Sequence, residues 1–384
     1  MTKEFFNRTA YKPVKLSAKR DITGALKAIS KKNQAVQIVD QYESMLEELF
    51  LLRNPGYRFD KDYRKEYEKF REIHLNNKHP DSGGAWFYYP WLNCAVHFLS
   101  EPLHQELRTG RNRNLITEKE QREFYRARVA ILGMSVGSHV ALTIVMTGGA
   151  KHIKLADPDI LSGSNLNRVR TGFQNIGLSK VISVARQIYE INPYAKVEIF
   201  PQGAGENNLK KILTGGGKLG LLVEEMDNPY LKLRARELAR AYRIPVIMAA
   251  DNDNGIIVDV ERYDLNKKHP ILLHGIMGIT GSGEIKTVDP QNLHKVIAKM
   301  AGAELSTVRM LESVTEVGKT LYSWPQLGNA ATLCGSVLAF LARKIILKEP
   351  IKSGRTNFSP DAIFTPLTKA ARKQRQAILN KMGI

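Results

Sequence analysis

The middle of the chain alternates short apolar runs with longer segments of helical spacing. Val129–Leu132 is an apolar run bounded by charge on one side and by glycine on the other, which predicts a buried strand. An apolar stretch, Val140–Met146, follows and ends at Gly148 and Gly149, and a second run comes at Ile153–Ala156. A strand, a helix and a second strand in this order predict two parallel strands joined by a helix.

The same alternation continues to about residue 263. Further strands are predicted at Val197–Phe200, Leu219–Val223, Pro245–Met248 and Ile256–Tyr263, and further helices at Val181–Glu190, Asn207–Leu213 and Tyr230–Tyr242. Ile256–Tyr263 alternates apolar and polar residues, so one of its faces is expected to be buried. This order predicts an α/β fold with a Rossmann-like, mostly parallel sheet and helices on both faces.

The residues before this region have a different pattern. Gln37–Leu52 has apolar residues at helical spacing and predicts a packing helix, whereas the alternating charges of Asp60–Glu72 predict a solvated helix. Ala85–Trp91 (AWFYYPW) suits either a stacking platform for a base or peptide or a small core, and the core is favoured. A strand is predicted after it, at Val96–Leu99. We therefore expect a largely helical N-terminal extension over residues 1–107.

The remaining segments complete the domain plan. A capping-box pattern at Thr117–Glu120 opens a helix before the first strand. Two later helices are predicted, at Asn292–Ala301 and Leu327–Leu347. The α/β domain is expected over residues 108–350, with a glycine-containing crossover region at about 266–326. Residues 351–384 carry seven basic residues against Asp361 alone, which suits a partner-binding arm or a solvated end equally well.

Composition limits the class of protein. The chain has 384 residues, 43% of them hydrophobic, so it can bury a substantial core. Its apolar runs fall short of the roughly 18 residues that a membrane span needs, and its first residues lack the apolar core of a secretion signal. Only two cysteines are present, Cys94 and Cys334, so no disulfide framework is expected. A reducing, cytoplasmic setting without a membrane is therefore expected.

The chain is strongly basic. Its formal charge is +19, from 57 basic and 38 acidic residues. A positive field of this size favours polyanions such as nucleic acids, nucleotides and acidic lipid surfaces. Charge that serves only solubility is an equally good interpretation, because no nucleic-acid-binding module is visible in the sequence.

The turn after the first strand has features of a phosphate-binding loop. Gly133 and Gly137 flank Ser135, and a helix follows, so backbone N–H groups and the positive end of that helix could face a phosphate. Asp157 ends the second strand about 20 residues after Gly137, where a ribose-binding carboxylate is expected. The same glycines also suit an ordinary tight turn.

Charged residues beyond the second strand favour a triphosphate over a simple dinucleotide. Asn165 and Arg168 follow Asp157, Lys180 comes next, and Asp227 follows a later apolar strand. An arginine forks onto phosphate oxygens, and a lysine supplies a point charge. A carboxylate can hold the Mg²⁺ that neutralises a departing pyrophosphate.

This series of motifs resembles the ThiF/MoeB/E1-like adenylyltransferase family. The motifs are D-x-D at Asp157 and Asp159, S-N-L-x-R ending at Arg168, I-G-x-x-K ending at Lys180, N-P at Asn192, and a strand ending in x-D-N at Asp227. The resemblance covers about residues 108–265 and the helix near 328–347. It implies an enzyme, often a homodimer, that uses ATP to adenylate a carboxyl group and releases pyrophosphate.

The resemblance also implies roles for single residues. Asp157 would bind the ribose, Asn165 and Arg168 the phosphates, Lys180 the pyrophosphate side, and Asp227 Mg²⁺. The nucleotide-binding set is completed by Gly133, Ser135, Gly137 and Asp159. Many members lend an arginine across a dimer interface, and Arg108, Arg111 and Arg113 occupy the corresponding place here.

Two features of many members are missing. Structural zinc there needs two C-x-x-C pairs, and two distant cysteines cannot form such a site, so no zinc is expected. The crossover region has no cysteine to receive an acyl group, and Cys334 lies in an apolar helix as a predicted packing residue. The resemblance therefore implies adenylation without an E1-type thioester, with the acyl-adenylate passing directly to an amine, thiol or water.

Other polar residues lie near these motifs. Glu224 and Glu225 could supply a metal ligand or a general base, but an ion pair of one of them with Arg168 or Lys180 is favoured. Structural roles are favoured for the two histidines closest to the turn, His139 and His152.

Four functions are compatible with the sequence. The leading one is adenylation of a carboxyl group on a protein, peptide or small molecule. The second is adenylation of RNA, as in the tRNA-modifying branch of the same family. The third is an NAD-dependent oxidoreductase, which leaves Arg168, Lys180 and Asp227 unexplained. The fourth is a non-catalytic interaction protein.

Overall fold

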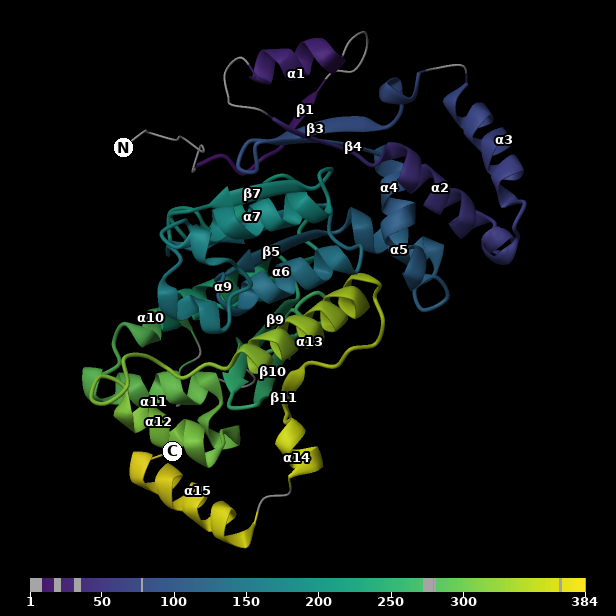
Figure 1. Cartoon of the computed structure of the whole chain (residues 1–384). Coiled ribbons are helices and arrows are strands. Elements are labelled where there is room, and N and C mark those ends of the chain that lie inside the picture. Colours follow the sequence, from purple (N-terminus) through teal and green to yellow (C-terminus); the bar gives the residue numbers. More distant parts are fainter. Residues whose placement is uncertain are drawn as a thin grey trace. The chain divides into compact units, whose positions relative to one another are not determined.

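The computed structural model describes residues 9–16, 22–30, 36–76, 79–271, 279, 281–365 and 368–383. The chain divides into two compact units (Figure 1). The first comprises residues 1–121 together with 185–194, and the second comprises 122–184 and 195–384. The predicted boundaries at residues 107 and 350 are not tested by this division, since it follows compactness and not function.

The first unit contains a four-stranded sheet with the strand order β1-β3-β4-β2. Its strands are β1 (Val14–Leu16), β2 (Gln37–Asp40), β3 (Ala85–Tyr89) and β4 (Cys94–Phe98). Its helices are α1 (Ile22–Ser30), α2 (Tyr42–Arg53), α3 (Tyr63–Leu75) and α4 (Glu101–Arg108), and α5 (Glu118–Arg126) begins in it. The sequence pattern predicted one of these strands, close to β4, and most of the helices.

The predicted helix Gln37–Leu52 is wrong at its start. Gln37–Asp40 is a strand that pairs in parallel with β4, and the helix begins only at Tyr42. The buried residues of α2 include Tyr42, Leu46 and Leu49, which repeat at helical spacing. Ile38 fits the same spacing by coincidence and is exposed.

The aromatic residues of β3 form a core. All five residues of β3 are buried. Trp86 stacks on His97 with ring centroids 4.4 Å apart, and Trp86 and Tyr88 pack with Ile22 of α1. Rings used in this way offer no open face to a base, so the structure agrees with the core interpretation.

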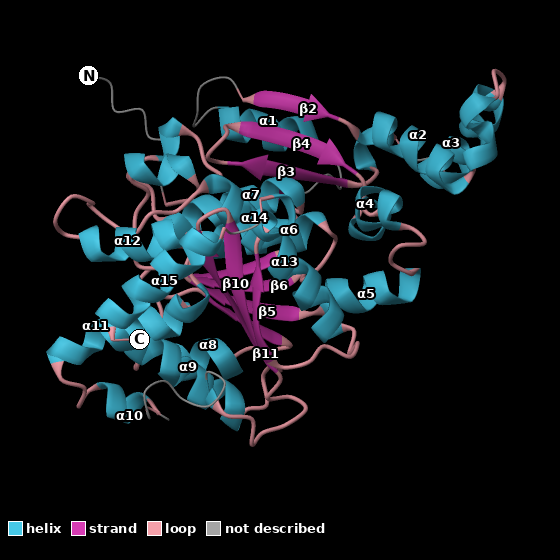
Figure 2. Ribbon diagram, turned by 90° about the horizontal axis from the view of Figure 1, so that it is seen from below, coloured by secondary structure: helices cyan, strands magenta, loops and turns pink. Residues whose placement is uncertain are grey.

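The second unit contains the larger of the two sheets (Figure 2). It has seven strands, in the order β11-β10-β9-β8-β5-β6-β7. Its strands are β5 (Arg128–Leu132), β6 (His152–Ala156), β7 (Lys196–Phe200), β8 (Leu221–Glu224), β9 (Val246–Asn252), β10 (Gly255–Glu261) and β11 (Gly354–Phe358). β5 to β9 pair in parallel, whereas β10 and β11 pair antiparallel. The strand order reverses between β5 and β8, and open α/β sheets bind ligands at such a switch point.

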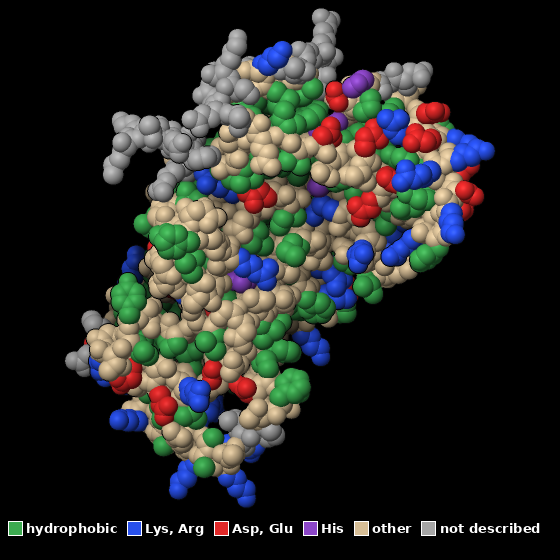
Figure 3. Space-filling model, viewed as in Figure 1, with side chains coloured by type: hydrophobic (Ala, Val, Ile, Leu, Met, Phe, Trp, Pro, Cys, Tyr) green, Lys and Arg blue, Asp and Glu red, His purple; other side chains and the backbone are tan. Residues whose placement is uncertain are grey.

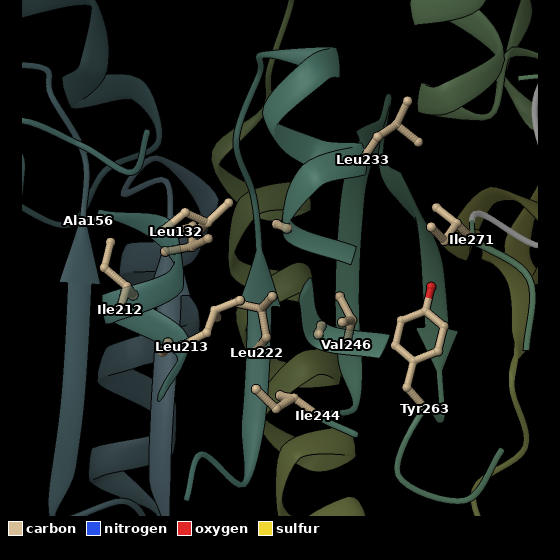
Figure 4. Close-up of a cluster of buried hydrophobic side chains, with 14 of the residues drawn as sticks. Leu132, Ala156, Ile212, Leu213, Leu222, Leu233, Ile244, Val246, Tyr263 and Ile271 are labelled. Carbon is tan, nitrogen blue, oxygen red and sulfur yellow. The ribbon is translucent and has the colours of Figure 1, made fainter. Parts of the chain in front are cut away.

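Helices cover both faces of this sheet, as predicted. Ile131 faces α6 (Val136–Met146), because a Cβ atom at Gly137 would stand 2.8 Å from it. Leu132, one position on, points to the opposite face. There it joins a core with residues of α8 (Leu209–Thr214) and α9 (Pro229–Ala241) (Figure 4).

The long apolar helix α13 (Gly328–Ile346) belongs to the α6 face. By length and composition alone it would suffice to cross a membrane, although half of it is buried. It packs on α6 and on β9. A Cβ atom at Gly335 would stand 2.6 Å from the Cβ of His139, so glycine permits the close approach of the two helices. A long apolar helix buried in a protein core can have the same length and composition as a membrane span.

Two expectations for the later part of the chain differ from the structure. β10 is buried along its whole length, because its polar residue Asp259 pairs with Arg355 and its Glu261 with Arg236. Residues 351–365 and 368–383 are folded and do not form an unstructured tail, since β11 extends the sheet and two helices with many exposed residues follow. These helices are α14 (Pro360–Phe364) and α15 (Lys369–Met382).

The described part of the crossover region contains three α-helices. Its helices are α10 (Ser282–Ile285), α11 (Pro290–Ala301) and α12 (Val308–Glu316). Gly275 and Gly278, which suggested loops here, lie outside the described residues. The helix α7 (Lys180–Ile191) precedes β7 and contributes residues to both units.

Candidate active site

The turn after β5 brings two strand ends into contact. Gly133 has a φ of +92°, and a Cβ atom there would stand 2.3 Å from the carbonyl oxygen of Glu225. Only glycine fits this conformation and this approach. Ser135 is the N-cap of α6 but makes no side-chain cap hydrogen bond. Its hydroxyl oxygen instead accepts a hydrogen bond from Arg168 Nε at 3.0 Å.

Asp157 fastens this turn to the end of β6. It is buried, and its Oδ2 accepts a hydrogen bond from the N–H of Met134 at 2.5 Å. Its Oδ1 accepts another from the N–H of Asp159 at 2.8 Å. Burial raises the pKa of Asp157, while the charge of Lys180 and the two N–H groups act to lower it. The carboxylate therefore has a structural role, and its contact with a ribose stays a prediction.

Arg168 follows the loop after β6 and lies within electrostatic reach of carboxylates after β8 and in β9. Burial lowers its pKa, and the carboxylates of Asp251 and Asp227 act to raise it. Its guanidinium also donates to Asn167 Oδ1 at 2.9 Å, in addition to the bond with Ser135. The side chain thus lies within electrostatic reach of two carboxylates from separate strand ends, which the sequence order alone did not reveal.

Lys180 forms an ion pair with Asp159. Its Nζ lies 2.7 Å from Asp159 Oδ2, and its charge also acts on Asp157. Within the described part of the chain, no ion pair joins Lys180 to Asp227. The charge of Lys180 therefore acts on Asp157, and those of Asp227 and Asp251 act on Arg168, while the ion pair of Lys180 is with Asp159. The Gly133–Ser135 turn links the two groups, because Asp157 and Arg168 both bond to it.

Asn165 and Asp227 differ in their surroundings. Asn165 is buried, and its Oδ1 accepts from the N–H of Ser162, which caps a short helical turn at Gly163–Asn167. Asp227 is exposed after β8. The next residue, Asn228, caps α9 by accepting a hydrogen bond from the N–H of Leu231.

The expected pairing of Glu224 or Glu225 with Arg168 or Lys180 is wrong. Glu224 is fully buried and pairs with Lys232 at 3.2 Å and with Arg236, both on α9. Burial alone would raise the pKa of Glu224, but these two cations bring it below its ordinary value. Its Oε1 also accepts from the N–H of Met226 at 2.8 Å. Glu224 therefore shapes the loop that carries Asp227.

Sequence reasoning missed a second carboxyl group beside Arg168. Asp251 lies in β9, where its Oδ2 accepts from Gln326 at 2.9 Å and its Oδ1 from the thiol of Cys334 at 3.4 Å. Burial raises the pKa of Asp251 and of the half-buried Glu225. The signal was present, since Asp251 comes directly after an apolar run of residues, as Asp157 does.

The cysteines and histidines have structural surroundings. Cys334 is fully buried, as predicted for a packing residue, and Cys94 is buried as well. His139 is buried, and its Nε2 hydrogen bonds to the carbonyl of Arg168. No group of three or more metal-binding side chains occurs among the residues that the structure describes.

The arginines expected to act across a dimer belong to the first unit. Arg111 and Arg113 are exposed, and Arg113 donates to the carbonyl of Leu52 and to Glu106. Arg108 ends α4. Their contribution to a nucleotide site stays a prediction.

Comparison with known proteins decides the family. The sequence profile of the ThiF family matches residues 109–376, more than half of the chain. The protein belongs to the ThiF family. The match includes β5 to β11 and every site residue of the second unit.

Two curated proteins are similar in sequence. The uncharacterized protein MT1398 of Mycobacterium tuberculosis is 32% identical over 339 residues, which are 88% of this chain and 46% of that protein. The tRNA threonylcarbamoyladenosine dehydratase of Escherichia coli is 28% identical over 143 residues, 36% of this chain and 52% of the relative. The chain thus spans about half the length of the curated relatives that it matches.

Solved structures of similar fold include PaaA, with 20% identity, coverage of 67% of this chain and 77% of PaaA, and a TM-score of 0.46. E. coli MccB with ATP has 17% identity, 67% coverage of each chain and a TM-score of 0.45. E. coli tRNA N6-threonylcarbamoyladenosine dehydratase, TcdA, has 19% identity, coverage of 63% and 95%, and a TM-score of 0.45. At these identities the likeness concerns the fold.

Proposed function

We propose that this ThiF-family protein is an ATP-dependent adenylyltransferase that converts a carboxyl group into an acyl-adenylate and releases pyrophosphate. The observation that carries the proposal is the placement of Arg168. This cation bonds to the turn after β5 and lies within electrostatic reach of carboxylates after β8 and in β9. A triphosphate at the switch point of the sheet would meet this cation together with backbone N–H groups of the turn.

The reaction needs little proton transfer. A carboxylate, ionised at neutral pH, attacks the α-phosphorus of ATP, and the bond to the departing pyrophosphate breaks. Arg168 and Lys180 would stabilise the negative charge that builds on the phosphate oxygens. Lys180 is held by Asp159, so a phosphate has to compete with that exposed carboxylate for the ammonium group.

Asp227 fits the requirement for Mg²⁺. This ion commonly uses one or two carboxylates together with substrate phosphates. Asp227 is exposed at the carboxyl end of β8, and its carboxylate lies within electrostatic reach of Arg168. When bound, Mg²⁺ would neutralise charge on the leaving pyrophosphate.

The acyl group would pass to its acceptor without a cysteine thioester. Both cysteines are buried, and burial raises the pKa of each thiol, which disfavours the thiolate nucleophile. An amine, a water or a thiol of another molecule would then receive the acyl group. The acyl substrate would be a protein, a peptide or a small molecule. One relative is named as a tRNA-modifying dehydratase, so an RNA substrate is the second candidate.

Binding of a fluorescent ATP analogue to the full chain with Mg²⁺ tests the proposal before any acyl substrate is known. Arg168→Ala should weaken binding roughly tenfold to a hundredfold, because a charged hydrogen-bonding group is lost. The exposed Arg170 offers a control of equal charge, and Arg170→Ala should change binding no more than about threefold. Pyrophosphate–ATP exchange with fractions of cell extract should then identify the acyl substrate.

Other results would favour other functions. Binding of NAD without binding of ATP would favour an oxidoreductase. Failure to bind any nucleotide would favour a non-catalytic interaction protein.

A further inference from the structure

The C-terminal helix α15 is fixed to the second unit by one of its faces. Leu379 is buried in a cluster with Ala298, Ala303 and Leu311, which belong to α11, α12 and the turn between them. Arg375 donates through Nε to the carbonyl of Ser306 at 2.6 Å. Apolar and polar contacts therefore hold the same face of the helix, and the opposite face is turned outward.

The outward face is basic. Lys369, Arg372 and Lys373 are exposed and lie at helical spacing on one side of α15, and Gln376 and Asn380 continue the same side. Figure 3 shows basic side chains projecting at the lower end of the view, where Figure 1 places α15. The face thus presents cations followed by amides along one line.

These cations are not neutralised by the residues around them. Within the residues that the structure describes, Lys369, Arg372 and Lys373 form no ion pair. The nearby carboxylates have other partners, since Glu304 binds Arg355 and Glu312 accepts from Gln374. Residues 351–384 hold seven basic residues against Asp361 alone, in a protein of charge +19. Unpaired, exposed cations of one sign attract a polyanion.

The contacts of α15 favour a nucleic acid over a lipid surface. A helix that lies in a membrane interface buries its apolar face among the acyl chains. Here Ile378, Leu379 and Met382 already pack against the protein, so this face of α15 is not free for lipid. Phe364 precedes the helix closely in sequence and is 83% exposed, which leaves a ring on which a base could stack.

We propose that the outward face of α15, defined by Lys369, Arg372, Lys373, Gln376 and Asn380, binds the phosphate backbone of a nucleic acid. The three cations contact phosphates, and the two amides donate hydrogen bonds to phosphate or sugar oxygens. This binding does not depend on the proposed adenylation, because the site residues Arg168 and Asp227 lie on other elements.

Fluorescence anisotropy with the full chain, without ATP, tests the proposal. The probe is a short fluorescein-labelled single-stranded RNA of mixed sequence, titrated over a range of salt concentrations. The triple variant Lys369→Gln, Arg372→Gln, Lys373→Gln should weaken binding roughly tenfold or more. It should also reduce the slope of log affinity against log salt by about 2, since each phosphate contact on a single strand contributes about 0.7.

A second triple variant separates this face from net charge. Lys61→Gln, Arg64→Gln, Lys65→Gln removes the same charge from exposed positions in and just before α3 of the first unit. Its effects on RNA affinity and on the salt slope should be much smaller than those of the α15 variant. DNA of the same sequence and vesicles rich in phosphatidylserine complete the series, and DNA binding through the same residues would keep the proposal with a broader ligand.

Three outcomes would overturn it. One is that the unaltered protein binds neither RNA nor DNA. Another is that both triple variants weaken binding equally, which would assign the effect to net charge. The third is that the protein binds anionic vesicles but no nucleic acid, and that the α15 variant loses the vesicle binding.

Discussion

At the scale of single residues, His139 explains how Arg168 is held. Burial lowers the pKa of His139, so the ring is neutral at neutral pH and carries one N–H. The carbonyl of Arg168 can only accept, so this N–H lies on Nε2. The sequence suggested a structural histidine, and the structure gives it the backbone carbonyl of Arg168, the proposed phosphate-binding residue, as its partner.

Substitutions of His139 should show whether its hydrogen bond to the Arg168 carbonyl, and not only its packing, supports nucleotide binding. His139→Gln places an amide donor near Nε2 and should retain affinity for the ATP analogue within about threefold. His139→Asn reaches only the place of Nδ1 and should weaken it roughly tenfold, the worth of one hydrogen bond. Equal affinities for the two variants, with melting temperatures that match, would contradict this role.

Two neighbouring glutamates should respond to pH in opposite directions. Glu225 has a raised pKa, so its stabilising contribution is present below its unfolded pKa of about 4.3 and is lost as pH rises through the folded value. Glu224 has a lowered pKa, so its contribution is present above that unfolded pKa and is lost as pH falls through the folded value.

Glutamine substitutions test these signs by urea unfolding at several pH values. Glu225→Gln should raise the free energy of unfolding at neutral pH, because the neutral amide avoids the cost of ionising a buried carboxyl group. Glu224→Gln should lower it by roughly 3 kcal/mol or more, since Lys232 and Arg236 lose a buried partner. The same sign for both variants would refute the assignment.

At the scale of elements, β11 and α11 depend on one partly buried arginine. Arg355 of β11 binds Asp259 of β10 through both Nε and a terminal nitrogen, at 2.7 and 2.8 Å. It also donates to the carbonyl groups of Lys299 and Met300 at the end of α11. The residue therefore ties the edge strand to a crossover helix, and no periodicity in the sequence indicates it.

Removal of this arginine should destabilise the second unit. Arg355→Gln leaves Asp259 buried without its cation and should lower the free energy of unfolding by roughly 3 to 5 kcal/mol. Arg355→Gln combined with Asp259→Asn should recover part of that loss, because the unpaired charge is then absent. A double variant less stable than the sum of the two single changes would contradict the pairing.

At the scale of the whole molecule, the sequence predicted the parallel part of the sheet well. β5 and β8 are short apolar runs bounded by glycine or charge, and β6 and β7 each hold one charged residue, Lys154 and Glu198, between apolar ones. Segments of this kind form strands in almost any α/β context. The first unit was predicted less well. β1 and β2 are short, and their pairing with distant strands decides their conformation, which local periodicity does not record.

The site shows the same division. The order of motifs in the chain was enough to select Asp157, Arg168, Lys180 and Asp227, because parallel strands place their carboxyl ends at one edge. It could not show that Lys180 pairs with Asp159, or that the Gly133–Ser135 turn bonds to both Asp157 and Arg168. It also could not show that Asp251 joins Arg168, since that depends on which strand lies beside β8 and on where α13 packs.

The sequence by itself determined the α/β class, the strands around the switch point and the residue types that a triphosphate requires, because these follow from local patterning and from spacing along the chain. Only the tertiary structure decided the charge pairs, the burial of Glu224 and Asp251, and the folding of the basic C-terminal residues into β11 and α15. Those features depend on contacts between residues far apart in the chain, where burial and paired charges outweigh local preference.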